Sequence, residues 1–402
     1  MHQYSYRDTW AEISLDLIQE NMTQFRQFVQ QQSKLMAVVK ADGYGHGAIV
    51  VAKASILAGA DYLGVALLDE AIQLRDAGIS TPILILGYTP PSSVKEAILA
   101  NITLTVFDHD VLDEVIVQST QLCKTATVHL KVDTGMSRIG VSSPIEVMRL
   151  VKKALSAEYI YLEGIFTHFA NADSEDPTYT YEQFSKFQSI LEYLVSNNIH
   201  VPIKHCCNSA ATMNYPDMHL DMVRIGIALY GLYPDKSLKN HPIRLRQAMS
   251  FKTRIAAIKN VVASQPISYG CTFKPDIESK IATLPVGYAD GLSRLLSNKG
   301  KVLIGEHLAQ ITGRVCMDQT MINVSDVENC LVGDEVTIFG SNHSSFQSVD
   351  QFADWMGTIN YEVVCLIGKR VPRVYFKHEQ QINNANKGQE FLKIKKESSY
   401  IF

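Results

Sequence analysis

The sequence lacks the features that mark membrane, secreted and nucleic-acid-binding proteins. It has no run of about 20 apolar residues, and its beginning, MHQYSYRDTWAEISL, has no apolar core of the signal-peptide type. No basic block occurs before the C-terminal tail, and 37 Lys and Arg against 41 Asp and Glu give a net charge of -4. This balance disfavours nucleic acid as a partner. We expect a cytoplasmic protein that binds neither membrane nor nucleic acid.

The cysteines are also too few and too irregularly spaced to form a disulfide framework or a structural metal site. The 7 cysteines make an odd number and include no C-x-x-C pair, so we expect reduced thiols and no metal site. With 46% hydrophobic and 19% charged residues, the chain is neither disordered nor a coiled coil. Its 402 residues favour one large domain with a smaller partner.

From residue 35 onward, short apolar runs rich in β-branched residues alternate with segments of helical period. Eight such strand and helix pairs over about 240 residues match the size of a (β/α)₈ TIM barrel. A doubly wound open sheet is the alternative. The predicted strands span residues 35–39, 62–67, 83–88, 102–107, 125–132, 161–169, 203–207 and 222–231.

The pattern changes after the polar stretch 233–246, which contains two prolines. Short strands separated by Gly, Asp and Asn turns then predict a second, mostly antiparallel β domain. We expect this domain to end with a helix near 348–357 and an apolar strand region over 360–376. The expected domains are a barrel over 15–240, a β domain over 247–377 and a polar tail over 378–402.

Polar or small residues occupy the positions where the predicted barrel strands end, which is where barrel enzymes place their working residues. They are Lys40, Lys131, His168, Ser209, Arg224 and Gly226. Taken singly, each residue also has a purely structural interpretation. Lys40 could be a solvated strand end, His168 could be a structural histidine, and Arg224 could pair with Asp221 or Asp217. Together, these residues fit pyridoxal phosphate (PLP), an aldehyde cofactor with a phosphate. They would supply an amine, an anion site after strands seven and eight, and an arginine.

Long motifs in a fixed order carry a resemblance to a known family. They are VVKADGYGHG, KVDTGMSRIG, EGIFTHFANAD, CCNSAA, VRIGIALYG, SYGCTF, LPVGYADGLSR, GRVCMDQTMINV and TINYEVVCLIGKRVPR. From about Lys34 to Arg373 the chain resembles the alanine racemases. The resemblance implies a (β/α)₈ barrel with a C-terminal β domain that also contains residues 1–14, PLP as cofactor, and a homodimer that shares its active sites.

The resemblance also implies roles for individual residues. Lys40 would bind the cofactor covalently and act as one acid/base catalyst, and Tyr269 of the partner subunit would be the other. His168 would lie between Tyr269 and Arg224, which would reach the pyridine nitrogen. The other expected cofactor contacts are Tyr44, Arg138, Asn208, Ser209, Gly226, Ile227 and Tyr361. The expected substrate contacts are Arg138, Met317 and Tyr288.

The chemistry explains why two catalysts are needed. Racemisation removes a proton from one face of Cα and returns a proton to the other face, so a single base would mostly restore the original enantiomer. Lys131 would add a second cation beside Arg138, and in the family a lysine at this position can be carbamylated, which makes it an anion. We expect Lys131 to be carbamylated.

Other activities remain open at this point. A PLP-dependent amino acid decarboxylase shares the architecture, a racemase of broader specificity would accept serine, and a PLP carrier would lack turnover. Tyr288 and Tyr361 would narrow the site to a methyl side chain, although both could equally be core tyrosines of the β domain. The expected function is to interconvert L-alanine and D-alanine, supplying D-alanine for peptidoglycan.

Overall fold

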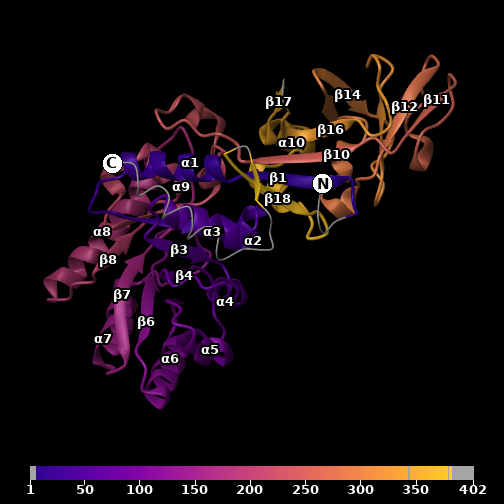
Figure 1. The fold of residues 1–402 in the computed structure, drawn as a ribbon. Helices are drawn as coiled ribbons and strands as arrows, with labels where there is room; N and C mark the ends of the chain where they lie inside the picture. Colours follow the sequence, from indigo (N-terminus) through magenta and orange to yellow (C-terminus); the bar gives the residue numbers. More distant parts are fainter. Residues whose placement is uncertain (1–5, 343–344, 379, 383–402) are drawn as a thin grey trace, which may run out of the picture. The chain divides into compact units, whose positions relative to one another are not determined.

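The computed structural model describes residues 6–342, 345–378 and 380–382, which fall into two compact units (Figure 1). We call Ile18–Gly43 with Ala48–Arg246 the barrel unit. The described residues up to Leu17, Tyr44–Gly47 and the described residues from Gln247 to Ile382 form the sheet unit. The short segment Tyr44–Gly47 therefore belongs to the sheet unit, although the chain on both sides of it belongs to the barrel unit.

Parallel strands form the core of the barrel unit, in the orders β4-β3-β2-β9 and β5-β6-β7-β8. A parallel bridge between Leu84 and Thr103 joins β4 to β5. The Arg224 N–H donates to the Cys207 carbonyl oxygen (3.1 Å) and so joins β9 to the end of β8. The strands are β2 (Lys34–Val38), β3 (Tyr62–Val65), β4 (Ile83–Ile85), β5 (Leu104–Val106), β6 (Ala126–Lys131), β7 (Ile160–Phe166), β8 (Ile203–His205) and β9 (Met222–Ile225). The strands close into a ring, which confirms the predicted barrel and excludes the open sheet.

Some helices between these strands bury one face, as α6 and α7 do. In α6 the buried residues Val111, Leu112, Val115 and Ser119 follow the spacing of one helical face. The Asp108 carboxylate caps this helix by accepting the Val111 N–H (2.8 Å). The helices are α1 (Leu15–Phe28), α2 (Lys40–Tyr44), α3 (Ala48–Leu57), α4 (Leu68–Asp76), α5 (Val94–Leu99), α6 (His109–Leu122), α7 (Pro144–Ser156), α8 (Thr178–Ser196) and α9 (Ser209–Asn214).

One continuous sheet builds the second unit, in the order β11-β12-β15-β14-β13-β16-β10-β1-β18-β19, with β17 paired to β16. The N-terminal strand β1 lies between β10, to which it is antiparallel, and β18, to which it is parallel. The other pairs are antiparallel, as predicted for this domain. The strands are β1 (Thr9–Ser14), β10 (Met249–Arg254), β11 (Ala257–Val261), β12 (Ser279–Leu284), β13 (Lys301–Ile304), β14 (His307–Ile311), β15 (Thr320–Asn323), β16 (Glu335–Ser341), β17 (Phe346–Gln347), β18 (Arg373–Lys377) and β19 (Gln380–Ile382).

The predicted strand region over 360–376 is wrong in its first part, where helix α11 (Asn360–Cys365) follows helix α10 (Val349–Met356). Val363 and Val364 are buried on this helix, so tertiary packing outweighs their preference for strands. The predicted tail 378–402 lies outside the described residues except for His378 and β19. Short 3₁₀ turns complete the fold: η1 (Pro91–Ser93), η2 (Pro216–Met218), η3 (Ile227–Tyr230), η4 (Lys236–Asn240), η5 (Tyr269–Cys271), η6 (Tyr288–Asp290) and η7 (Arg294–Leu296).

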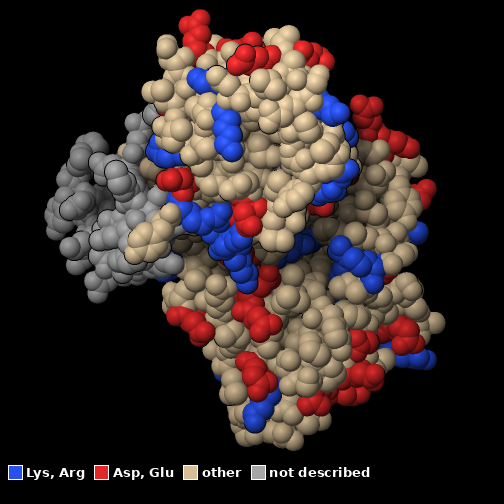
Figure 2. All heavy atoms as spheres, turned by 90° about the vertical axis from the view of Figure 1, so that its right-hand side faces the viewer, with Lys and Arg blue, Asp and Glu red and all other residues tan. Residues whose placement is uncertain are grey.

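The surface carries charges of both signs. Figure 2 shows Lys and Arg side chains interspersed with Asp and Glu side chains on the face that it draws, in keeping with the net charge of -4. Among the described residues, no helix combines the length and the apolar character that crossing a membrane requires.

Candidate active site

Polar side chains gather at the carboxyl ends of the barrel strands. Lys131 is the last residue of β6, His168 follows β7, and Arg224 lies in β9. Nη2 of Arg224 donates a hydrogen bond to Nδ1 of His168 (3.0 Å). His168 lies within electrostatic reach of four basic side chains, those of Arg224, Lys131, Arg138 and Lys40. The barrel therefore brings these five residues together, although they were predicted from separate motifs.

Lys40 stands at the start of a strained turn. Three consecutive residues after it adopt left-handed conformations, with φ of 52°, 53° and 62° (Ala41, Asp42 and Gly43). This conformation costs a residue with a side chain about 1–2 kcal/mol. The Ala41 N–H donates to Oε1 of Glu70 (2.6 Å), and the Asp42 carboxylate accepts an N–H from the start of α3 (3.0 Å). Strain that is held by specific contacts is typical of functional sites.

The loop after β6 is built around Asp133. Its Oδ1 atom accepts three consecutive backbone N–H groups at 2.9, 2.9 and 3.1 Å (Gly135, Met136 and Ser137). Ser137 adopts a left-handed φ of 56°, and the loop then presents Arg138, which is exposed. The Lys131 side chain at the base of the loop is only 4% exposed, and its Nζ lies 4.7 Å from the centroid of the Phe166 ring.

The predicted phosphate site is assembled by the loops after β8 and β9. The Gly226 N–H donates to Oγ of Ser209 (2.9 Å), so these two residues lie side by side although they are far apart in sequence. Asn208 precedes α9 and caps it by accepting the Ala211 N–H (2.9 Å). Ile227 begins the turn that follows Gly226 and is buried. The two loops thus converge where barrels commonly hold a phosphate.

Arg224 has partners other than those weighed from the sequence. Asp221 forms an ion pair with Lys204 (2.7 Å), whereas the guanidinium of Arg224 bonds His205 and His168. It also donates to the carbonyl oxygens of Thr167 and Cys206 (3.0 and 2.9 Å). The described contacts therefore include no carboxylate against this guanidinium, and the charge is held by neutral acceptors.

These contacts begin a directional chain of hydrogen bonds. A guanidinium only donates, so Nη1 of Arg224, 2.8 Å from Nδ1 of His205, requires that nitrogen to accept. The His205 proton is then on Nε2, which donates to Nδ1 of His129 (3.0 Å). His129 in turn donates from Nε2 to Oε2 of Glu163 (3.0 Å). Tyr62 donates its hydroxyl to the same Glu163 oxygen. The chain links a cation at the rim to a carboxylate deeper in the barrel.

Burial keeps the histidines of this chain neutral. The pKa of His205, which is fully buried, and that of His168, which is partly buried, are well below the usual value, first because both are desolvated and next because Arg224 is close. Burial also lowers the pKa of His129, although the adjacent Glu163 opposes that change. Burial lowers the pKa of Arg224 to about 10, so the guanidinium remains charged at neutral pH.

Sequence reasoning missed His129, His205, Glu163 and Tyr62. Each lies within an apolar strand and interrupts its hydrophobic run with a polar group. In a barrel, alternate residues of each strand face the packed interior, so single polar residues inside several strands could have signalled a buried polar network.

Tyr269 projects from a strained turn of the sheet unit. Ser268, Gly270 and Cys271 around it have φ of 65°, 74° and 50°. Oγ of Ser268 donates to the Arg314 carbonyl oxygen (2.7 Å) and ties the turn to the sheet. The tyrosine is 74% exposed, so its phenol is directed away from its own unit.

Tyr288 and Met317, two other predicted residues of the sheet unit, are also exposed. Tyr288 is 43% exposed, which excludes the alternative of a core tyrosine. Its N–H donates to the Cys316 carbonyl oxygen (3.0 Å), so Tyr288 lies beside Met317. Tyr361 lies in α11, and its ring centroid is 6.3 Å from that of Tyr44. The sheet unit thus holds two pairs of predicted site residues.

Comparisons with known proteins identify the family of the chain. The family model "Alanine racemase, N-terminal domain" matches residues 13–234, and "Alanine racemase, C-terminal domain" matches residues 248–375. Alanine racemase 2 of Oceanobacillus iheyensis is 54% identical over 95% of this chain and 97% of its own length. The crystal structure of alanine racemase from Bacillus anthracis with bound L-Ala-P has a TM-score of 0.90 and 38% identity, and covers 94% of this chain and 97% of that one. The alanine racemase of Clostridium difficile 630 in complex with cycloserine has a TM-score of 0.87 and 40% identity, over 94% and 98% of the two chains. The chain belongs to the alanine racemase family.

Proposed function

We propose that the protein is a PLP-dependent alanine racemase that interconverts L-alanine and D-alanine. The observation that carries this proposal is the rim of the barrel, where Lys40, the Ser209 and Gly226 pair and Arg224 lie at strand ends. A cofactor with an aldehyde, a phosphate and a ring nitrogen needs an amine, an anion site and a polar partner, and the rim supplies all three. The relative named alanine racemase 2, which is 54% identical, supports alanine as the substrate.

The residues present fit such a cofactor. The Ser209 hydroxyl and the backbone around Gly226 form a small polar cradle for a phosphate, and the turn after Lys40 fixes its backbone. When bound, PLP withdraws electrons from the carbanion formed at Cα. We propose that it is held by Lys40, Tyr44, Arg138, His168, Asn208, Ser209, Arg224, Gly226, Ile227 and Tyr361.

Two bases would move the proton between the faces of Cα. Nζ of Lys40 serves one face and the phenolic oxygen of Tyr269 the other: one group removes a proton from Cα while the other donates a proton to the opposite face, and the two roles exchange when the reaction runs in the opposite direction. Arg138, the Met317 backbone N–H and Tyr288 hold the substrate carboxylate and limit the side chain. Free lysine and tyrosine have pKa values of about 10.4 and 10, so both need neighbours that favour the basic form.

His168 would assist Tyr269 as a hydrogen-bond donor. Because Nδ1 of His168 accepts from Arg224, its proton is on Nε2. A neutral imidazole N–H next to the tyrosine oxygen stabilises the phenolate, and the charge of Arg224 adds to that effect. His168 and Arg224 would therefore act on the second base while also bordering the cofactor.

The exposure of Tyr269 supports a shared active site. A phenol that is 74% exposed on a strained turn is available to a second copy of the chain. We propose a homodimer in which Tyr269 of the partner subunit completes the site at each barrel. The product, D-alanine, would supply peptidoglycan, and the place of action would be the cytoplasm.

The surroundings of Lys131 favour carbamylation of its side chain. Burial first, and then Arg224 and Arg138, place the pKa of Lys131 well below its usual value, which favours the neutral amine. That amine attacks carbon dioxide, forms a nitrogen–carbon bond, and loses one proton to give a carbamate anion. The anion would pair with Arg138. In protein equilibrated with ¹³C-bicarbonate we expect a carbamate ¹³C signal that Lys131→Gln removes, and an unchanged spectrum would contradict the assignment.

Incubation with L-alanine in heavy water tests the main proposal. Purified protein with PLP should form D-alanine that carries deuterium at Cα. Absence of both D-alanine and exchange would refute the racemase proposal, and release of carbon dioxide would favour the decarboxylase, which the comparisons do not favour. Serine should react more slowly than alanine, because Tyr288 and Tyr361 would leave little room beyond a methyl group.

A further inference from the structure

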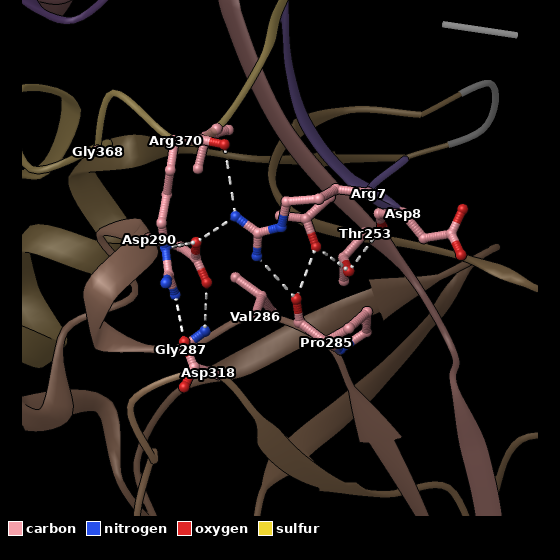
Figure 3. A network of polar contacts seen from close by, with 12 residues as sticks. Arg7, Asp8, Thr253, Pro285, Val286, Gly287, Asp290, Asp318, Gly368 and Arg370 are labelled. Carbon is pink, nitrogen blue, oxygen red and sulfur yellow. Dashed lines mark hydrogen bonds and ion pairs between the residues drawn. The ribbon is translucent and has the colours of Figure 1, made fainter. Parts of the chain in front are cut away.

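A buried carboxylate lies at the end of the turn that carries Tyr288. Asp290 is fully buried, and its Oδ1 atom accepts from Nη1 of Arg7 (2.6 Å) and from Nε of Arg370 (2.7 Å). Its Oδ2 atom accepts the Gly287 N–H (3.0 Å). Figure 3 shows the two guanidinium groups converging on this carboxylate from separate segments of the sheet unit.

Arg370 also connects this turn to the segment that contains Met317. Its Nη2 atom donates to Oδ1 of Asp318 (2.6 Å), the residue after Met317. The Tyr288 N–H and the following N–H donate to the carbonyl oxygens of Cys316 and Met317 (3.0 and 3.1 Å). Side-chain and backbone hydrogen bonds thus both join the turn that carries Tyr288 to the segment that contains Met317. We call Arg7, Asp290, Asp318 and Arg370 the clamp.

The backbones joined by the clamp are in tight contact. A Cβ atom at Gly287 would lie 2.3 Å from the Cys316 carbonyl oxygen and 2.4 Å from that of Met317, so only glycine allows this approach. At Gly291 the φ is 107°, and a Cβ atom would lie 2.4 Å from the Leu366 carbonyl oxygen. A shift of the 287–291 turn would therefore displace the 316–318 segment as well.

The clamp contains two positively and two negatively charged side chains. Burial alone would raise the pKa of Asp290, but the hydrogen bonds from Arg7 and Arg370 outweigh it and hold the pKa below its usual value. The carboxylate is thus ionised at neutral pH and keeps both guanidinium groups. Arg370 reaches two carboxylates with different nitrogens of one planar group, which a lysine ammonium cannot reproduce.

We infer that the clamp positions Tyr288 and Met317 and thereby sets the size of the side chain that the site accepts. This inference rests on the proposed function, because the roles of Tyr288 and Met317 in substrate binding belong to it. Asp290 and Arg370 are positioning residues, since they act on the substrate only through the backbone and side chains that they hold.

Two variants test the clamp. Asp290→Asn removes the charge that holds both guanidinium groups, and Arg370→Lys keeps the charge but cannot bridge Asp290 and Asp318. In each we expect the KM for L-alanine to rise about tenfold and the alanine-to-serine ratio of kcat/KM to fall about fivefold, because small displacements of binding groups weaken recognition. Arg370→Lys also serves if Asp290→Asn fails to fold.

Lys252 provides a matched control. It is a central, largely buried charge in the same unit, paired with Glu12 (2.9 Å) and Glu335 (3.0 Å), and these pairs connect strands rather than the Tyr288 turn. Lys252→Gln should lower stability yet leave the alanine-to-serine ratio within about twofold of wild type. If the clamp variants also keep that ratio while losing stability, the inference is overturned.

Amide hydrogen exchange separates this inference from the proposed function. In Asp290→Asn the N–H groups of Gly287, Tyr288 and Ala289 should exchange at least about tenfold faster, and in Lys252→Gln they should not. Unchanged exchange would refute positioning by the clamp. If the wild-type protein fails to racemise alanine, the proposed function fails, and the exchange rates then decide whether the clamp holds the turn.

Discussion

Nη1 of Arg224 lies 2.8 Å from Nδ1 of His205, and this contact sets the direction of the hydrogen bonds that lead to Glu163. Arg224 is a donor to both His205 and His168, so each histidine accepts at Nδ1 and carries its proton on Nε2. The cation is thus held by neutral groups, while the balancing carboxylate lies two histidines away. Within the part of the chain that the structure describes, no carboxylate contacts Arg224 and cancels its charge.

We expect ¹⁵N NMR to find His129, His168 and His205 in the neutral form with the proton on Nε2. The contacts of Arg224 and Glu163 at the two ends of the chain require this form. Selectively labelled histidine and one-residue substitutions would assign the signals. A protonated Nδ1 at His205 would contradict the direction that we derive.

The free energy of unfolding should rise as the pH increases through the range in which histidine titrates in the unfolded chain. The pKa values of His129, His168 and His205 are lowered in the folded state, mainly by burial, so below about pH 6.5 the unfolded chain binds more protons. Their contribution is complete above about pH 6.5 and is lost as the pH falls towards the folded pKa values. Each group adds a slope of about 1.4 kcal/mol per pH unit in that window.

Urea unfolding between pH 5.0 and 7.5 measures this slope. His205→Phe removes one titrating group and should reduce the slope by about 1.4 kcal/mol per pH unit. Phe187→Leu, which removes buried volume from α8 but no titrating group, is the control and should leave the slope unchanged. A wild-type stability that is flat over this range would be inconsistent with buried neutral histidines.

Two substitutions should separate cofactor attachment from proton transfer. Tyr269→Phe removes only the phenolic oxygen, so it should keep the visible absorbance of bound PLP while racemisation falls about 10²–10⁴-fold. Lys40→Ala should lose the normal absorbance as well as the activity. Absorbance spectra and D-alanine formation measure both effects. Full activity in either variant would reject the assignment of two bases.

Ser137→Gly should stabilise the protein by about 0.5–1 kcal/mol. The left-handed φ of 56° strains serine but not glycine, and this gain exceeds the greater entropy of glycine in the unfolded chain. The N–H that donates to Asp133 is retained. Ser293→Gly is the opposite case, because φ there is -55° and the side chain caps a turn, so that variant should be destabilised. The midpoint of urea unfolding checks both.

The sequence predicted the barrel well because its strands are uniformly apolar and alternate with helical segments. The apolar runs beginning at Leu35 and Tyr62 became parallel strands almost where expected. The run through Val363 and Val364 misled the prediction, because a short apolar segment fits a buried helix equally well.

The candidate site was predictable only in part. Lys40 and Ser209 follow strands and lie next to recognisable motifs, so position and resemblance identified them. His129 and Glu163 have no motif of their own, and only the closing of the barrel brings them to His205 and Tyr62. The clamp escaped notice for the same reason, since Arg7 and Arg370 reach Asp290 from opposite ends of the chain.

The place of β1 in its sheet has a consequence for biosynthesis. Thr9–Ser14 is translated early, yet its neighbours are Met249–Arg254 and Arg373–Lys377. At ribosomal speeds of about 5–20 residues per second, this strand waits on the order of tens of seconds for its second neighbour. Meanwhile both of its edges lack their final partners, and unpaired strand edges invite association with other chains. Strand β1 is therefore a segment of the nascent chain that we expect a chaperone to protect.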